Sequence, residues 1–443
     1  MRVQRLFFHV ARVPRDLSLI VVLRLWQAGA GLVTTVMAVR FLSPALQGWY
    51  YSFLSVAALY TLFELGLSTV LVQVSAHAFV GLRWTQGDVI EGAGSGRFKS
   101  LLGKAVRWYA VMALTFALLL LPSGCVFFGS EKSAGFLWVA PWLVLCCLTA
   151  GGLLVTPFLS VLEGSGQIAE IYAVRLALAV CGSLACWAML ATGGKLWATT
   201  MIPAAALCVP LLWLVRRRRN LFTIVCQKLD ESYEWRKEVW PLQWRLGTSW
   251  LCGYLLTQIN IPILFHMHGP IVAGQLGLSL AVVNTVGLIA QAWLLRRVPT
   301  MAQAAAVGDW HRLDRLFSRD FGIAAAVFLT GAVTVLSLAR LLSEASFVQR
   351  LLPWPQLLGL FIFALANQLI GGLATQLRSF RREPLVWLTV MGTILTVPLA
   401  FYAGRRYSSA GLITVLAAAN CLVNLPAAIF IWHRCNRIWR KTT

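Results

Sequence analysis

The chain has 443 residues, of which 59% are hydrophobic and only 12% are charged. Soluble domains are about 45–50% apolar and about 25% charged, so a soluble protein of this composition would expose large apolar patches and aggregate. The composition excludes a soluble enzyme, a disordered chain and a fibrous protein. It predicts an all-α polytopic membrane protein, with room for about twelve spans of about 20 residues each.

Long apolar runs mark the expected membrane spans. The first run follows a basic N-terminus but is too long for a signal peptide, so we expect it to be retained as the first span. The expected spans cover residues 17–40, 50–78, 105–128, 136–162, 170–191, 197–215, 246–266, 271–295, 321–343, 353–376, 385–402 and 409–432.

The charged residues are unevenly divided between the signs, with 38 Lys and Arg against 16 Asp and Glu and a net charge of +22. In a membrane protein we expect this excess to set orientation, not to bind nucleic acid, because cytoplasmic loops collect Lys and Arg. If the N-terminus is cytoplasmic, the outside segments hold only Arg40, Lys132, Lys195, Arg350, Arg405 and Arg406. We therefore expect both termini of this multi-pass protein in the cytoplasm.

The segment between the sixth and seventh expected spans divides the chain into halves. Pro44-x-x-x-Gly48 opens the second expected span, and Pro270-x-x-x-Gly274 opens the eighth, its counterpart in the other half. This echo favours two pseudo-symmetric bundles, because internal repeats are common in transporters. The predicted parts are an N-terminal six-helix bundle, a cytoplasmic amphipathic linker and a C-terminal six-helix bundle, at residues 1–215, 216–244 and 245–443.

The linker combines basic residues with a helical apolar pattern. It opens with four consecutive arginines, and its apolar residues then recur every four positions, which places them on one helical face: Leu221, Val225, Leu229 and Tyr233. Such a face can lie on an anionic inner leaflet. The plainer interpretation is that the arginines only hold this loop in the cytoplasm.

Three arginines lie inside expected spans or at their cytoplasmic edge, where charged side chains usually face a cavity or a partner. Arg24 lies about 7 residues into the first span, or about 10 Å from its cytoplasmic end. Arg175 lies near the start of the fifth span, and Arg245 at the start of the seventh. Together they can form a cationic site for phosphate, because a planar guanidinium binds two oxygens at once. The alternative is that they reach back to lipid head groups.

Glu64 is the one carboxylate that we expect deep inside a span. Its depth in the second span is close to that of Arg24 in the first. The structural interpretation is a static Arg24–Glu64 ion pair. The functional interpretation is that Glu64 binds a coupling ion such as a proton and thereby releases Arg24 for an anionic cargo. The sequence leaves both interpretations open.

Amides and aromatic rings in the expected spans are candidates for contact with sugars. Amides can hydrogen-bond sugar hydroxyls, although hydrogen bonds between helices explain most amides in membrane spans. No metal site or cofactor is expected, because the ten cysteines form no CxxC pair and His266-Met267-His268 has no third ligand. The predicted substrate contacts other than the arginines are Trp26, Gln27, Gln258, Asn260 and Asn284.

The segment Arg40-Phe-Leu-Ser-Pro44-Ala-Leu-Gln47-Gly48-Trp-Tyr-Tyr51, followed by Phe63-Glu64-Leu65-Gly66-Leu67, resembles bacterial polysaccharide flippases of the Wzx type. These belong to the multidrug/oligosaccharidyl-lipid/polysaccharide exporter superfamily, and the resemblance extends to the twelve-span layout and the central linker. It implies two six-helix bundles, a cationic central cavity and alternating access. The motif match includes Glu64, whereas the roles of the arginines follow from their depth alone.

The resemblance also implies a cargo and a cellular place. The cargo would be undecaprenyl-pyrophosphate-linked oligosaccharide, moved from the inner to the outer leaflet of the bacterial cytoplasmic membrane for surface polysaccharide (O-antigen) biosynthesis. A proton or sodium gradient would drive the movement. Polysaccharide polymerases would be partners in the same pathway.

Other functions stay open at this point. A multidrug-type exporter of the same superfamily is less favoured, because cationic drugs need acidic cavity residues and Glu64 is the one candidate. A membrane glycosyltransferase, polymerase or ligase needs catalytic acids or bases, usually on long outside loops, and every expected outside loop is short. A scaffold in a polysaccharide assembly complex is a further alternative. We therefore expect a transporter and not an enzyme.

Overall fold

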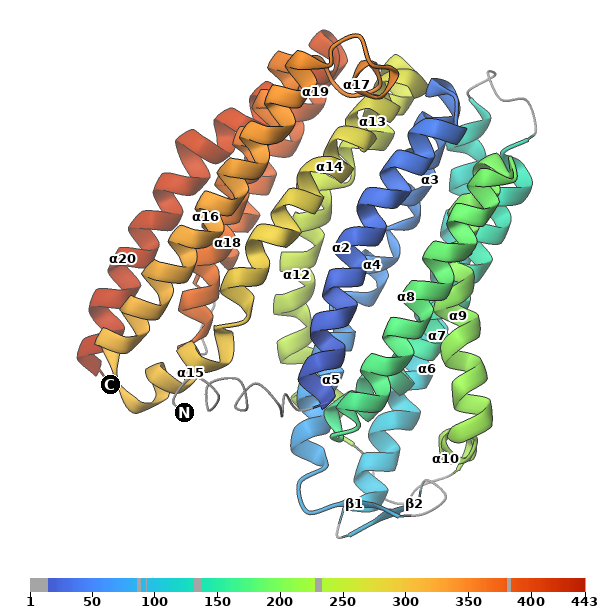
Figure 1. Ribbon diagram of the computed structural model, residues 1–443. Helices are drawn as coiled ribbons and strands as arrows, with labels where there is room; N and C mark the ends of the chain where they lie inside the picture. Colours follow the sequence, from blue (N-terminus) through green and yellow to red (C-terminus); the bar gives the residue numbers. More distant parts are fainter. Residues whose placement is uncertain are drawn as a thin grey trace, which may run out of the picture. The chain divides into compact units, whose positions relative to one another are not determined.

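A computed structural model describes residues 15–85, 89–92, 94–130, 137–227, 233–380 and 384–442, and the described chain is almost entirely helical (Figure 1). The one sheet pairs two short antiparallel strands, β1 (Arg83–Thr85) and β2 (Val89–Glu91). The helices of the first half are α2 (Arg15–Phe41), α3 (Pro44–Ala57), α4 (Tyr60–Glu64), α5 (Leu67–Ala78), α6 (Ser95–Gly129), α7 (Val139–Gly164), α8 (Ile168–Ala191), the 3₁₀ turn η2 (Lys195–Trp197), α9 (Ala198–Arg217), α10 (Asn220–Cys226) and α11 (Trp235–Glu238).

The second half continues the same pattern of long helices joined by short turns. Its elements are α12 (Trp240–Thr257), α13 (Asn260–His268), α14 (Pro270–Leu295), α15 (Val298–Val307), α16 (Trp310–Leu341), α17 (Ser346–Gln349), α18 (Trp354–Arg378), α19 (Val386–Ala419), the π-helical segment η3 (Asn420–Asn424) and α20 (Leu425–Thr442).

Ten stretches of the described chain are long and apolar enough to cross a membrane, against about twelve expected. One of the ten, Val386–Trp439, contains two of the expected spans. The backbone leaves the helical conformation at Tyr407 and Ser408, and Gly392 faces Asn424 across the resulting hairpin. The stretch therefore runs out and back, and it accounts for the eleventh and twelfth expected spans.

The second and seventh expected spans are interrupted helices. The second consists of α3, α4 and α5, and the chain between α4 and α5 adopts positive φ at Leu65 (50°) and Gly66 (66°). The seventh expected span is divided into α12 and α13 around Gln258 and Ile259, which leaves neither piece long and apolar enough to count among the ten. Interrupted helices in transporters are tolerated where other groups satisfy the freed backbone.

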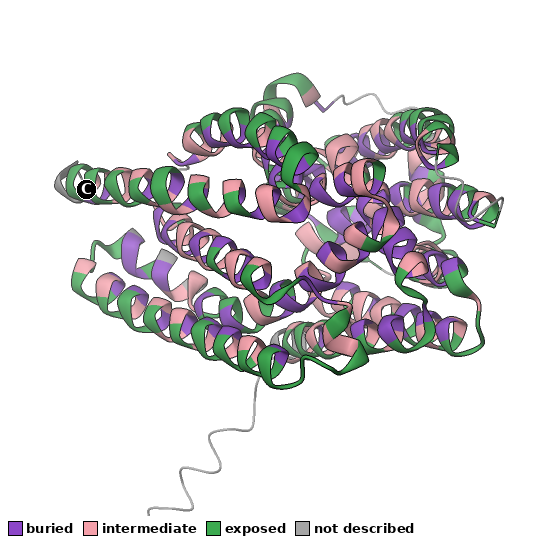
Figure 2. Cartoon of the chain, turned by 90° about the horizontal axis from the view of Figure 1, so that it is seen from above, coloured by how far each residue is buried: buried purple, intermediate pink, exposed green. Residues whose placement is uncertain are grey.

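Many apolar side chains on these helices are exposed, as expected for helices that face lipid. Leu25 is 68% exposed, Leu118 64% and Ile394 63%, and all three lie in stretches that can span a membrane. Figure 2 shows exposed and buried residues on opposite faces of many helices. The exposed faces are apolar, which in water would be a liability and in a bilayer is the stable arrangement.

The chain forms two compact units by the density of its internal contacts. Unit 1 contains residues 1–30 and 60–247, and unit 2 contains residues 31–59 and 248–443. Unit 2 thus combines the second half of the chain with the end of α2 and all of α3. The bundle boundaries expected from the sequence, at 215 and 245, stay a prediction.

Within unit 2, α3 and α14 cross where the two Pro-x-x-x-Gly patterns meet. A Cβ on Gly274 would lie 2.8 Å from the backbone nitrogen of Gly48, and a Cβ on Gly48 would overlap the carbonyl group of Pro270. The buried Gln47 side chain donates a hydrogen bond to the Gly274 carbonyl at 2.9 Å. Glycine is needed at both positions because the two backbones touch.

Within unit 1, the hairpin β1–β2 and helix α10 cover one end of the bundle (Figure 1). Leu221 of α10 is buried in a core that includes Phe98 and Leu162, and the partly buried Val225 packs against the same core. Leu229 lies outside the described residues. This apolar face of the linker packs on protein, so the expectation that it lies on a lipid surface is wrong for these side chains: burial in the core removes them from the membrane.

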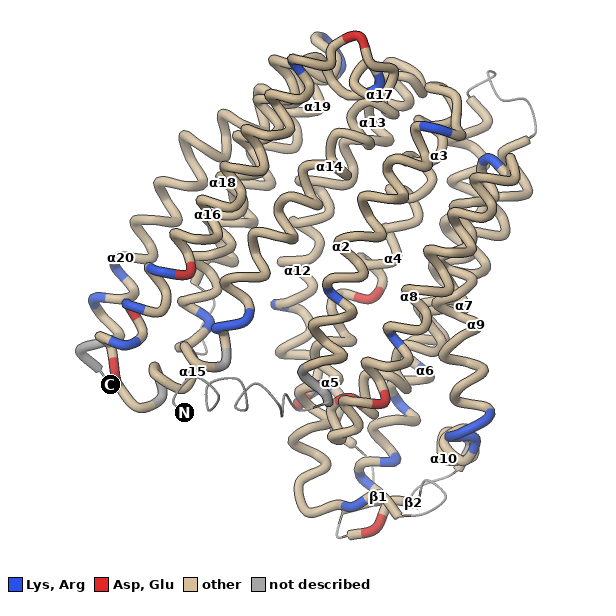
Figure 3. The backbone as a smooth tube through the Cα atoms, in the orientation of Figure 1, with Lys and Arg blue, Asp and Glu red and all other residues tan. Residues whose placement is uncertain are grey.

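The last part of the linker is also fixed to unit 1. Ser100 accepts a hydrogen bond from the Tyr233 amide at 3.1 Å, and Lys104 donates to the Tyr233 carbonyl at 2.7 Å. Arg97 forms an ion pair with Glu238 at 2.6 Å. Figure 3 shows that Lys and Arg gather at this end of unit 1 and, separately, at the end of unit 2 that carries α15 and the C-terminus.

Candidate functional site

A cluster of charged side chains in unit 1 joins two of the predicted arginines. Arg175 on α8 forms an ion pair with Glu163 on α7, with 2.6 Å between Nη2 and Oε2. The Arg175 guanidinium also lies 5.2 Å from the centre of the Tyr172 ring. Arg24 on α2 makes no hydrogen bond to this tyrosine, but its charge acts on the Tyr172 hydroxyl. We call Arg24, Glu163, Tyr172 and Arg175 the arginine cluster.

The turn between α7 and α8 explains how this cluster forms. Glu163 lies in the last turn of α7, and Tyr172 and Arg175 lie three residues apart near the start of α8, so they share one helical face. The chain reverses at Gly166, whose φ is 91°. The reversal brings the carboxylate of one helix against the guanidinium of the next, and the Tyr172 hydroxyl donates to Glu163 Oε1 at 3.4 Å.

Arg24 has no carboxylate partner in the part of the chain that the structure describes. Its guanidinium donates a 3.4 Å hydrogen bond to Gln27, one turn further along α2. The Arg24–Glu64 ion pair, which is one interpretation of the sequence, is not formed. The cluster therefore holds two guanidinium groups and one carboxylate, with a net charge of +1 when all are ionised.

Glu64 has a different partner. Its Oε1 accepts a 3.0 Å hydrogen bond from the hydroxyl of the buried Tyr109 and a 3.3 Å hydrogen bond from the Ser68 amide. Because Leu65 and Gly66 break the helix just after Glu64, the carboxylate meets the start of α5, where free backbone amides favour negative charge. The depth of Glu64 can be estimated from the sequence, but the helix break that redirects this side chain cannot.

Trp26 and Arg245, two other predicted contacts, have local partners. The Trp26 indole donates to the Ser183 hydroxyl at 3.1 Å, and its ring lies 6.2 Å from that of Trp187. The exposed Arg245 guanidinium lies 5.7 Å from the ring of its neighbour Trp244. No interaction within the described chain links Arg245 to the arginine cluster, so its role in binding stays a prediction.

The predicted amides of the second half lie in unit 2, in different settings. Asn260 is buried and donates to the carbonyls of Leu256 and Thr257, so it satisfies backbone groups at the break between α12 and α13. The exposed Asn284 lines a cavity of about 400 Å³, which Gln258 does not line. The other polar side chains around this cavity are Thr257, Gln291, Asn367 and Gln368.

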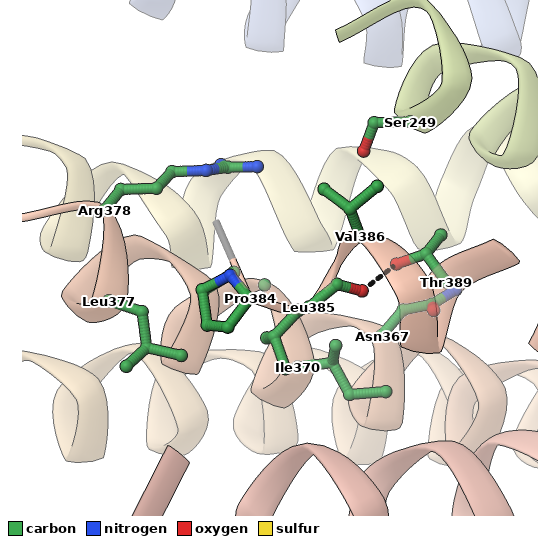
Figure 4. Close-up of a pocket in the computed structure, with 11 residues that line it drawn as sticks. Ser249, Asn367, Ile370, Leu377, Arg378, Pro384, Leu385, Val386 and Thr389 are labelled. Atoms are coloured by element: carbon green, nitrogen blue, oxygen red, sulfur yellow. Dashed lines mark hydrogen bonds between the residues drawn. The ribbon is translucent and has the colours of Figure 1, made fainter. Parts of the chain in front are cut away.

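A smaller cavity of about 200 Å³ lies beside it in unit 2 and also uses Asn367. Figure 4 shows Arg378, at the end of α18, extending along this cavity in the direction of Ser249. Thr389 on its rim donates to the Leu385 carbonyl at 3.0 Å. The two cavities offer amides, hydroxyls and one guanidinium, a set that suits polyols and anions.

Two carboxylates that lie in helices are not predicted as helical by the sequence pattern, which places Glu163 in a loop and Asp320 just before the ninth span. Helix α16 begins at Trp310, and Asp320 is only 1% exposed, bonded to Arg296 at 3.3 Å and to Arg297 at 3.1 Å. That Glu64 is the one carboxylate deep inside a span stays a prediction, but Glu163 and Asp320 both belong to helices, because span boundaries drawn from hydropathy stop at the first charged residue while the helices continue.

Known metal-binding arrangements are not found in the described residues. No group of three or more His, Cys, Asp or Glu side chains is placed there to hold a metal ion. Glu64, Glu163 and Asp320 each have hydrogen-bonding or charged partners from the protein itself.

Comparisons with known proteins connect this architecture to transporters. No protein-family model matches the sequence, and no curated protein matches it significantly. Among solved structures, the chain is similar to an inward-facing multidrug resistance MATE-family transporter of the MOP superfamily, with a TM-score of 0.66 and 15% identity over 94% of this chain and 99% of that one. An outward-facing transporter of the same description gives a TM-score of 0.56 with 13% identity and covers 98% of both chains.

A third similar structure is that of a MOP superfamily transporter from Pyrococcus furiosus, described as having a binding pocket of reverse polarity that suggests a different function. Its TM-score is 0.51, with 15% identity over 97% of this chain and 94% of that one. These likenesses confirm the expected fold class, an all-α polytopic membrane protein built as two bundles. The chain therefore has the fold of the MATE-type transporters of the MOP superfamily.

Proposed function

We propose that this protein is an alternating-access exporter whose cargo is an amphiphile with an anionic head group, specifically an undecaprenyl-pyrophosphate-linked oligosaccharide. The observation that carries the proposal is Arg24, a guanidinium inside a membrane-spanning helix that has no carboxylate partner in the described chain and interacts with the Tyr172 of the arginine cluster. A bare cation at this depth is costly unless it meets water or an anion.

The cluster matches the chemistry of a phosphate head group. Two guanidinium groups offer several N–H donors, and the Tyr172 hydroxyl adds one more. A pyrophosphate would bring more negative charge than the single Glu163 carboxylate now in place. Binding the head in a polar site removes the desolvation barrier that prevents a charged lipid from crossing the bilayer unaided.

The same proposal gives roles to other predicted residues. Gln27 holds Arg24 by a hydrogen bond, and Asn284 lines the cavity of about 400 Å³ in unit 2, where amides can bond sugar hydroxyls. Glu64, held by Tyr109, is the proposed coupling site for a proton or sodium gradient. The site would work in the bacterial cytoplasmic membrane, with polysaccharide polymerases as downstream partners.

A multidrug-type exporter is the second candidate, and the structural neighbours favour it. Two of the similar structures are described as multidrug resistance transporters. Besides Glu64, the helices carry Glu163 and Asp320, although both of these acids are paired with arginine. An organic cation would need one of these acids to be released from its present partners.

One experiment separates the two candidates. Arg24→Ala is expressed in cells that lack the parental protein, with Arg40→Ala as the control because Arg40 lies at the other end of the same helix. We expect Arg24→Ala to abolish surface polysaccharide and to accumulate the lipid-linked precursor, while Arg40→Ala exports normally. Normal polysaccharide together with lost resistance to cationic drugs would reject the flippase and support the multidrug exporter.

A further inference from the structure

Glu163 occupies the position that an anionic ligand of the arginine cluster would need. Its Oε2 lies 2.6 Å from Arg175, and its Oε1 accepts from the Tyr172 hydroxyl. A bound phosphate that used Nη2 of Arg175 or the Tyr172 hydroxyl would compete with Glu163 for these donors. Cargo binding and the Glu163–Arg175 pair therefore compete.

We propose that Glu163 is a displaceable counter-ion that fills the arginine site when no cargo is bound and leaves when a phosphate-bearing head group enters. This inference rests on the proposed function, because it assumes that the arginine cluster binds the head group. It adds a residue that determines which anions bind: only a ligand that outcompetes a carboxylate already at Arg175 can enter.

The charges indicate which ligand would succeed. Arg24 and Arg175 contribute two positive charges and Glu163 one negative charge, so the empty site is incompletely neutralised. A ligand with one negative charge would only replace Glu163, whereas a diphosphate can neutralise both guanidinium groups and also accept from Tyr172. The net positive charge of the cluster therefore favours a ligand with more than one negative charge.

The exposure of the pair makes the exchange feasible. The Glu163 side chain is 16% exposed and that of Arg175 is 31% exposed, so neither is sealed in the protein interior. An ion pair of this kind contributes little net stability, since part of its attraction replaces hydration. Asp320 differs because its carboxylate is only 1% exposed, although its partners Arg296 and Arg297 are 45% and 37% exposed.

The test measures binding of farnesyl pyrophosphate to the purified full-length protein in detergent by titration calorimetry at constant pH. Glu163→Gln keeps the size of the side chain and removes its charge. We expect it to bind about fivefold more tightly than the parent, the ratio that corresponds to releasing a pair worth about 1 kcal/mol. Glu163→Asp, whose shorter side chain meets Arg175 less well, should give a smaller gain in the same direction.

Glu170→Gln is the matched control. Glu170 also pairs with an arginine of unit 1, Arg218 at 2.8 Å, but lies outside the cluster. Loss of the Glu170 charge should leave the affinity for farnesyl pyrophosphate unchanged. Thermal unfolding of each variant shows that the compared proteins are folded.

The outcomes distinguish this inference from the proposed function. If the parent binds and Arg24→Ala does not, but folded Glu163→Gln binds no more tightly than the parent, Glu163 is a structural partner and the counter-ion role is rejected. If neither the parent nor any Glu163 variant binds the diphosphate, the proposed function fails and this inference fails with it. Tighter binding by Glu163→Gln that Arg24→Ala abolishes supports both.

Discussion

Because α3 and α14 cross at backbone contact distance, one added methyl group at the crossing should destabilise the protein. In Gly48→Ala the new Cβ would overlap the backbone carbonyl group of Pro270, which cannot rotate away as a side chain can. The two helices must separate. Overpacking of this kind costs about 1–3 kcal/mol. Separation would also stretch the buried hydrogen bond from Gln47 to the Gly274 carbonyl, and a buried polar group left unsatisfied costs about 1–3 kcal/mol more.

We therefore expect Gly48→Ala to lower the free energy of unfolding by about 3 kcal/mol, since the two costs overlap and do not simply add. Thermal unfolding in detergent, followed by the loss of soluble folded protein, measures the change. Gly253→Ala is the control, because a Cβ at Gly253 meets nothing within 4 Å and alanine favours a helix by about 1 kcal/mol over glycine. If Gly48→Ala is as stable as Gly253→Ala, the close crossing is not real.

Three further changes test other parts of the structure. Asp320→Asn should lower the free energy of unfolding by about 1–3 kcal/mol, because the buried side chain loses its charge-assisted hydrogen bonds to Arg296 and Arg297; thermal unfolding checks this. Tyr109→Phe should cost about 1–3 kcal/mol by the same assay, because Glu64 loses its phenol donor. Burial raises the pKa of Glu238, but hydrogen bonds from Tyr233 and Arg97 outweigh it and lower the pKa below its usual 4.5. The contribution of this carboxylate to linker docking is thus present above about pH 4.5 and is lost as the pH falls through the lowered pKa. Protease cleavage of the linker should rise in that acidic range, and Glu238→Gln should remove the pH dependence.

Some features of the site can be predicted from residue type and depth alone. A charged side chain in an apolar run is costly wherever the run folds, so the sequence is enough to single out Arg24 and Arg175. The ion pair of Arg175 with Glu163 depends on how the helices that carry them meet. Tyr172 cannot be identified as a site residue from the sequence, because tyrosines are common in apolar runs.

Other features depend on how the helices end and turn. A hydropathy pattern ends at the first charged residue, even where the helix continues past it. It therefore assigns Glu163 and Asp320 to loops, although both lie in helices. Depth alone matches Glu64 with the wrong partner, because positive φ at Leu65 and Gly66 starts a new helix there. Local backbone conformation of this kind has no reliable signature in composition.

The sequence by itself determined that this is a helical membrane protein of about twelve spans, since burying so many apolar residues in lipid requires helices that satisfy their own backbone. It also contained the two Pro-x-x-x-Gly patterns as matching positions in the two halves. Only the tertiary structure decided that Gly48 and Gly274 touch one another and that Glu163, not Glu64, meets an arginine. Contacts between distant segments depend on helix direction and packing, which no local pattern encodes.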